Sequence, residues 1–182
     1  ARLKKLIPQS VLMLRWQYVE RRTNRKLQRY AKAKDVFTKV YEIGKWGRST
    51  ELGEKYYSGS GSHTDAAVTP YVSAVCGFLQ SLPKKPDAVD LGCGDFAIGS
   101  RVRPYCGKYT AADVVEGLLE RNKEKYVNES VDFREMDIIN DDLPKAEVVF
   151  IRQGFQHRSN SEIAKVAAKL QTRYRFIILT EH

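Results

Sequence analysis

Residues 88–94 combine an acidic side chain with two closely spaced glycines. A short apolar run leads to Asp90, and Gly92 and Gly94 follow with one residue between them. Because glycine has no Cβ, the backbone N–H groups of such a turn can approach a ligand at the end of a strand. The carboxylate of Asp90 would attract an ammonium or sulfonium group and repel a pyrophosphate. The stretch therefore predicts a ligand-binding turn that favours a cationic ligand.

The glycine spacing alone leaves two alternatives open. Gly92, Gly94 and Ala97 also fit the Gly/Ala form of the dinucleotide fingerprint, with an acid, Asp113, about 20 residues further on. The same spacing also occurs in tight turns between a strand and a helix that bind nothing. The segments that follow have to distinguish these possibilities.

Short apolar strands alternate with amphipathic helices over the rest of the chain. Strands are predicted at 109–113, 131–137, 147–151 and 176–179, with helices near 114–126 and 159–170. This alternation predicts an α/β fold with a doubly wound, mostly parallel sheet wrapped by helices. An acid that ends the second strand of such a sheet, here Asp113, can accept hydrogen bonds from both hydroxyls of a ribose.

Four motifs in this order resemble those of the class I, Rossmann-like S-adenosylmethionine-dependent methyltransferases. Residues 89–94 are similar to the first motif, 109–113 to the second and 134–137 to the third. Residues 142–151, continuing to His157, are similar to the fourth. The resemblance covers residues 66–182 and implies a Rossmann-like fold and S-adenosyl-L-methionine as cofactor.

The resemblance also implies a cofactor site. Asp90 would face the methionine ammonium through water, Asp113 would hold the ribose hydroxyls, and Asp137 would accept from the adenine amino group. Arg152 and its neighbours would flank the methionine amine, and Cys93 would be a small filler in the turn rather than a nucleophile. The implied cofactor-binding residues are Asp90, Gly92, Cys93, Gly94, Asp113, Asp137, Ile138, Arg152 and Gln153.

Two features depart from the family pattern. Phe96 stands where the family often has a third glycine, so the contour of the methionine pocket is expected to differ. The family usually adds two strands that complete a seven-stranded sheet. This chain stops after the fifth expected strand, so we expect a C-terminally incomplete domain.

His157 is the candidate catalytic residue. It lies just past the fourth strand, at the sheet edge where ligands bind, and an imidazole can take a proton from a hydroxyl acceptor near neutral pH. The alternative is a histidine that only shapes the loop. His63 is a second, weaker candidate base, and no cluster of acids and histidines suggests a metal.

Basic residues concentrate at the N-terminus. Residues 1–40 hold twelve Lys and Arg against two acids, which leaves 19 basic and 20 acidic residues in the rest. Residues 1–42 are therefore interpreted as a basic amphipathic helical arm. It could pack on the catalytic domain or a second subunit, lie on an anionic membrane, or bind RNA.

A loop rich in glycine, serine and aromatic residues joins arm and domain at 43–65. Its stretch Gly59, Ser60, Gly61, Ser62 and His63 reads equally as a flexible linker or as a mobile lid that binds substrate.

The predicted activity is methyl transfer to a hydroxyl or amine, with a glycan or lipid-linked saccharide as one acceptor class and RNA as another. A small-metabolite methyltransferase, an NAD-dependent oxidoreductase and a non-catalytic binding module are the remaining alternatives. Three cysteines without metal-ligand spacing favour a reducing compartment. No apolar run approaches the about 18 residues of a membrane span, so we expect a cytoplasmic protein, peripheral to a membrane if the arm binds lipid.

Overall fold

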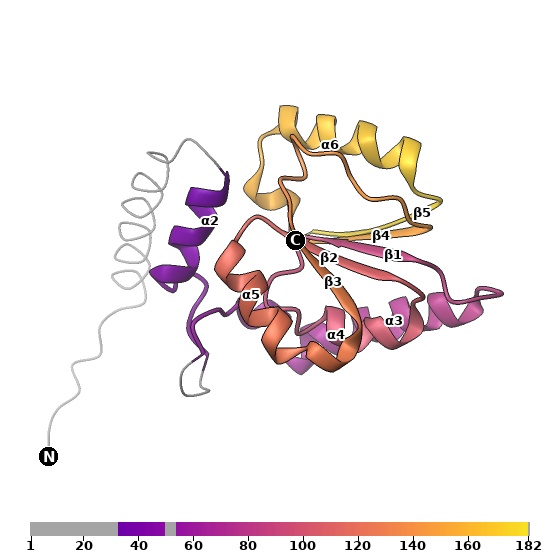
Figure 1. The fold of residues 1–182 in the computed structure, drawn as a ribbon, viewed down its shortest axis with the longest axis horizontal. Helices are drawn as coiled ribbons and strands as arrows, with labels where there is room; N and C mark the ends of the chain where they lie inside the picture. The colour runs from indigo at the N-terminus through magenta and orange to yellow at the C-terminus, as the bar shows by residue number, and fades with distance from the viewer. Residues whose placement is uncertain (1–32, 50–53, 182) are drawn as a thin grey trace, which may run out of the picture.

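A single parallel sheet organises the structure, a computed structural model that describes residues 33–49 and 54–181, apart from the His157 side chain (Figure 1). Within these residues the strands are β1 (Ala88–Leu91), β2 (Tyr109–Asp113), β3 (Val131–Glu135), β4 (Val148–Arg152) and β5 (Phe176–Thr180). Their order is β3-β2-β1-β4-β5, and all four pairings are parallel. The predicted doubly wound parallel sheet is confirmed, and its strand order reverses between β1 and β4.

Helices cover both faces of the sheet. Figure 1 shows α3 (Asp65–Ser81), α4 (Gly99–Val102) and α5 (Glu116–Lys125) on one face and α6 (Asn160–Arg173) on the other. The helix α2 (Ala33–Glu42) lies beside α5, at the rim of the sheet. Short 3₁₀ helices complete the described residues: η1 (Ser60–Ser62), η2 (Arg103–Tyr105), η3 (Val127–Glu129) and η4 (Phe155–His157).

The central strands are apolar because both of their faces are buried. Along β4, Val148 and Phe150 point to the α3 side, while Val149 and Ile151 point to the α6 side. All four side chains are buried, as expected for strands of a parallel sheet that is covered on both faces. These two layers hold the carboxyl ends of the strands rigidly along one edge.

The helix α6 begins where the sequence predicts it. Ser159 is the N-cap, and its hydroxyl accepts from the backbone N–H of Glu162. The Glu162 carboxylate accepts in return from the Ser159 N–H at 2.8 Å, which completes a capping box. The cap starts α6 just after η4 and so directs the chain away from the carboxyl edge of the sheet.

Phe96 occupies the position of the missing third glycine in an uncommon backbone conformation. Its φ is +62°, in the left-handed region, yet its side chain is fully buried. The ring packs edge-on against Tyr109, Tyr126 and Phe133, with centroids 5.7, 5.1 and 5.0 Å away. The strain of a left-handed residue, about 1–2 kcal/mol, is therefore offset by a core aromatic cluster.

We expect Phe96→Ala to lower the free energy of unfolding by about 3–5 kcal/mol, because it empties the centre of this cluster. The matched control is Val127→Ala, at a side chain that is 72% exposed, which should change stability by less than about 0.5 kcal/mol. Chemical denaturation of both variants measures the difference. A loss below about 1 kcal/mol for Phe96→Ala would contradict the central role of this ring.

Candidate functional site

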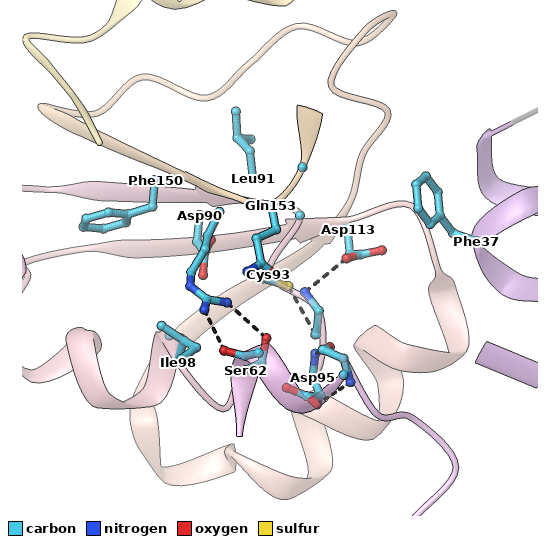
Figure 2. A pocket seen from close by; sticks show the side chains of 18 of the residues that line it. Phe37, Ser62, Asp90, Leu91, Cys93, Asp95, Ile98, Asp113, Phe150 and Gln153 are labelled. Atoms are coloured by element: carbon cyan, nitrogen blue, oxygen red, sulfur yellow. Dashed lines mark hydrogen bonds between the residues drawn. The ribbon is translucent and has the colours of Figure 1, made fainter. Parts of the chain in front are cut away.

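A cavity of about 330 Å³ lies at the carboxyl ends of the strands (Figure 2). It opens where the strand order reverses between β1 and β4, which is the usual binding crevice of an open α/β sheet. Its walls come from the ends of β1, β2 and β4, the loop after β3, residues 58–62 and the helix α2. The volume lies at the lower end of the range for small-molecule sites, about 300–1,000 Å³.

The glycine turn exposes bare backbone to this cavity. Gly92 has a φ of +81°, and a Cβ added to it would meet no atom within 4 Å. Gly94 has a φ of +54°, and a Cβ there would collide with the side chain of Ser58. Gly92 therefore leaves room for a ligand, whereas Gly94 leaves room for the segment that covers the turn.

The backbone N–H groups of the turn are used within the protein. Those of Gly92 and Cys93 donate to the carbonyl of Ala112 at 2.8 and 3.0 Å, and that of Gly94 donates to Asp113 Oδ2 at 3.1 Å. The approach of backbone N–H groups of this turn to a ligand stays a prediction. These bonds tie the turn to the end of β2, and it is the bare Cα surface of Gly92 that faces the cavity.

Two buried acids mark the ends of β1 and β2. The Tyr109 hydroxyl donates to Asp90 Oδ2 at 3.2 Å, and burial raises the pKa of Asp90 to about 7. Asp113 accepts from the N–H groups of Gly94 and Val115, both at 3.1 Å. Burial also raises the pKa of Asp113, although these backbone hydrogen bonds oppose the shift. Both carboxyls line the cavity, where a cationic ligand would favour their ionised forms.

Cys93 and Asp137 interact mainly with groups of the protein itself. Burial raises the pKa of the Cys93 thiol well above its usual value, which disfavours a nucleophilic thiolate. Asp137 is not among the residues that line the cavity, and its two oxygens accept from the Ile139 N–H at 3.0 Å and from Asn140 Nδ2 at 2.7 Å. Its neighbours Met136 and Ile138 do line the cavity. The bond from Asp137 to adenine stays a prediction.

Residues 58–63, the covering segment, lie against the glycine turn. The Ser58 N–H donates to Asp95 Oδ2 at 2.8 Å, and the Asp95 N–H donates to Ser58 Oγ at 2.8 Å. His63 Nε2 lies 2.7 Å from the same Asp95 oxygen, and its ring stacks on Tyr57 at 4.6 Å. Because His63 is not on the cavity wall, its interactions favour a role in holding this segment over proton transfer.

Arg152 holds the covering segment from the opposite side. Its guanidinium donates to the Gly61 carbonyl at 2.6 Å and to Ser62 Oγ at 3.2 Å, and it lies 5.4 Å from the centre of the Tyr71 ring. Gln153, which follows it, has a φ of +55° and also lines the cavity. Figure 2 shows Gln153 between Asp90 and Asp113, opposite Ser62.

Sequence reasoning missed the part of the wall that α2 supplies. Phe37, Tyr41 and, just after the helix, Trp46 line the cavity. The Tyr41 hydroxyl is hydrogen-bonded to Ser58 Oγ at 3.2 Å, and its ring meets Trp46 edge-on at 5.1 Å. The predicted arm includes α2, but residues 1–32 lie outside the described residues. The available sequence signal was the aromatic spacing of residues 37, 41 and 46 close to the glycine-rich loop.

The candidate base, His157, follows the carboxyl end of β4. His157 ends η4, directly after β4, and its neighbours Gln156 and Arg158 line the cavity. Glu181 holds η4 in place by accepting from the N–H groups of Phe155 and Gln156 at 2.8 and 3.1 Å. The side chain of His157 is outside the described part of the structure, so its catalytic role stays a prediction.

The described residues contain no group of three or more His, Cys, Asp or Glu that could hold a metal ion. Within the same residues no helix has both the length and the apolar character needed to cross a membrane.

We expect the stability of the ligand-free protein to fall as pH rises from about 4 to about 7. The pKa of Asp90 is about 7 in the folded protein, against about 3.9 in an unfolded chain. In this range the folded state therefore binds more protons than the unfolded state, and raising the pH favours unfolding. Asp113 contributes in the same direction, since its pKa is also raised by burial.

Asp90→Asn should make this fall in stability shallower. In the control Asp142→Asn, which alters a side chain that is 95% exposed, the pH dependence should stay close to that of the parent. Denaturant unfolding at several pH values between about 4 and 7 measures both slopes. A parent-like slope in Asp90→Asn would show that Asp90 does not titrate in this range.

No family model matches this sequence, and no curated protein matches it either. Many solved structures do match it. A methyltransferase from Leishmania major, described as S-adenosylmethionine-dependent, is 18% identical over 62% of this chain and 49% of its own, with a TM-score of 0.53. An S-adenosylmethionine-dependent methyltransferase from Clostridium acetobutylicum is 14% identical over 63% of this chain and 50% of its own, with a TM-score of 0.52.

A structure with a bound ligand is also similar. The N-methyltransferase NodS from Bradyrhizobium japonicum, in complex with S-adenosyl-L-homocysteine, is 11% identical over 58% of this chain and 56% of its own, with a TM-score of 0.52. The chain thus spans about half of the length of these proteins, and at such identities the likeness is one of fold. The strand order and these likenesses together confirm that this chain has the Rossmann-like fold of the class I S-adenosylmethionine-dependent methyltransferases.

Proposed function

We propose that this protein transfers a methyl group from S-adenosyl-L-methionine to a hydroxyl or amine acceptor. One observation carries the proposal: the bare surface of Gly92 faces a cavity between the buried carboxyls of Asp90 and Asp113. A carboxyl at each side suits a ligand that carries a cationic amino acid at one end and ribose hydroxyls at the other.

The same geometry argues against a dinucleotide. A pyrophosphate needs free backbone N–H groups at the start of a helix, but the three N–H groups of residues 92–94 are bound to the end of β2. The helix after the turn, α4, begins only at Gly99 and has four residues. Two buried acids beside the turn would also repel phosphate. The observations therefore favour a sulfonium cofactor over NAD.

When bound, the cofactor would supply an activated methyl group. The chain would bind and orient the cofactor and shield the reacting centre from water. Asp90, Gly92 and Asp113 would hold its amino acid and ribose portions, with Met136 and Ile138 beside the adenine. The covering segment, held by Asp95 on one side and Arg152 on the other, would exclude water from the reacting centre. Methyl transfer is an in-line displacement, so this alignment would supply most of the rate enhancement.

Three features of the chain bear on the methyl acceptor. A hydroxyl acceptor needs a base, and His157 lies at the carboxyl edge of the sheet after β4. The fourth motif lacks the Asn/Asp-Pro-Pro-aromatic run of enzymes that methylate amino groups of DNA bases. The twelve basic residues within positions 1–40 suit an anionic membrane surface. We therefore favour a glycan or lipid-linked saccharide over structured RNA.

The cofactor is tested by calorimetric or thermal-shift titration of the 182-residue chain with S-adenosylmethionine, S-adenosylhomocysteine and NAD. A ligand that binds only the folded state adds about 2.7 kcal/mol of stability at a hundredfold excess over Kd. We expect this stabilisation with the two sulfur ligands and none with NAD. Stabilisation by NAD alone would overturn the proposal.

If His157 is the general base, His157→Ala should lower kcat by about 10²–10⁴ and leave the affinity for S-adenosylhomocysteine nearly unchanged. His157→Asn, which keeps a polar side chain but no basic nitrogen, should lower kcat by as much. Assays with saccharide and RNA acceptors, each with and without residues 1–32, identify the acceptor class. Full turnover in His157→Ala would remove this residue from the reaction.

A further inference from the structure

We propose that Phe37 and Arg158, which belong to none of the four strand-end motifs, bind the purine nucleoside end of the ligand. The inference rests on the proposed cofactor and assigns two new contact residues to its site. Phe37 lies on α2, within the predicted basic arm, and Arg158 directly follows η4. Both line the cavity.

The nucleoside end of the cavity is recognisable from its chemistry. Asp113 supplies a carboxylate that suits ribose hydroxyls, and Val114, Met136 and Ile138 supply an apolar wall near the ends of β2 and β3. Figure 2 shows Phe37 across from Asp113, with Asp90 and Phe150 at the opposite end of the cavity. A flat, apolar base next to the ribose would therefore have the Phe37 ring on its open side.

Contacts on several sides hold α2 in the position that places the Phe37 ring at the nucleoside end of the cavity. Lys34 pairs with Glu116 at 3.1 Å and with Glu135 at 2.7 Å, which links α2 to the start of α5 and the end of β3. These exposed pairs each add little stability, but Tyr41 is buried and packs with the residues around Val115 and Leu118. The position of Phe37 is thus set before any ligand binds.

Arg158 provides a second, independent observation. Its guanidinium lies 5.3 Å from the centre of the Phe37 ring, within the range of a cation–π contact. Its Nε is buried and has no hydrogen-bond partner among the described residues. A buried donor without a partner is costly, so an oxygen of the ribose or a nitrogen of the base would relieve that cost. The Arg158 charge also partly offsets that of nearby Asp113, whose pKa burial raises.

The consequence is that α2 belongs to the cofactor site as well as to the arm. Removing the whole predicted arm, residues 1–42, would then weaken cofactor binding, whereas removing residues 1–32 would leave the Phe37 wall in place. This outcome differs from that of an arm that only contacts a membrane or RNA.

The experiment compares two ligands in the full chain by calorimetry: S-adenosylhomocysteine and 5′-methylthioadenosine, which shares the nucleoside and lacks the amino acid. Phe37→Leu keeps an apolar side chain without an aromatic face and should raise both Kd values by about 5- to 150-fold, the range for loss of base stacking. Arg158→Met keeps the apolar stem without the donor and should raise both by about 10-fold or more.

Two control variants match these changes outside the cavity. Arg175→Met removes the guanidinium that lies 4.9 Å from the Phe176 ring, and Ile43→Ala shortens a 41%-exposed side chain just after α2. Both controls should bind the two ligands as the parent does. Thermal melts without ligand test whether each variant is folded, and Arg158→Met gives its own result if Phe37→Leu does not fold.

Equal losses for the two ligands would support the assignment. Parent-like binding by both variants would overturn it while the proposed cofactor stands. A loss for S-adenosylhomocysteine alone would also overturn it, because the two residues would then serve the amino-acid end. If the parent binds neither ligand, the proposed function and this inference both fail.

Discussion

The hydrogen bonds between the glycine turn and the end of β2 are the constraint on which the site depends. Two N–H groups of the turn share the Ala112 carbonyl, and the Gly94 N–H binds the Asp113 carboxylate. They fix the turn and the acid relative to each other, and both glycines need positive φ values to make this geometry. A carboxylate that receives two backbone N–H groups is also oriented before any ligand arrives.

Once the turn is fixed, the residues after it connect the site to the rest of the molecule. Asp95, which is only 3% exposed, binds the covering segment through Ser58 and His63. Phe96 turns into the core, where its ring lies against the position that a Gly99 side chain would occupy. Phe96, at the third glycine position, therefore packs into the core beside the turn, and its ring is not among the residues that line the cavity.

The site concentrates negative charge at a cost to the folded state. Burial is the largest cause of the raised pKa of both carboxyls, and the charge of Asp113 raises the pKa of Asp90 further. Arg152 and Arg158 offset part of this charge from the β4 side. Perturbed acids gathered in one cavity are typical of binding and catalytic sites, where stability is given up for function.

The sequence by itself determined the sheet, its strand ends and the acids that lie on them. Apolar runs of strand length that alternate with helical patterns specify a parallel sheet, and the carboxyl ends of such strands must meet at one edge. Asp90, Gly92 and Asp113 could therefore be assigned to one site from their places at strand ends, and the family resemblance added Arg152. The capped start of α6 was also predictable, because the capping box at Ser159 and Glu162 is local.

Only the tertiary structure decided which groups face the cavity. The orientation of Asp137 toward its own loop, and the use of the turn's N–H groups by β2, depend on backbone angles that residue spacing does not specify. The contribution of Phe37, Tyr41 and Asp95 depends on contacts between segments far apart in the chain, such as Tyr41 with Ser58 and Ser58 with Asp95. The local sequence shows that α2 is amphipathic. Which surface α2 packs against depends on the folded shape of the domain.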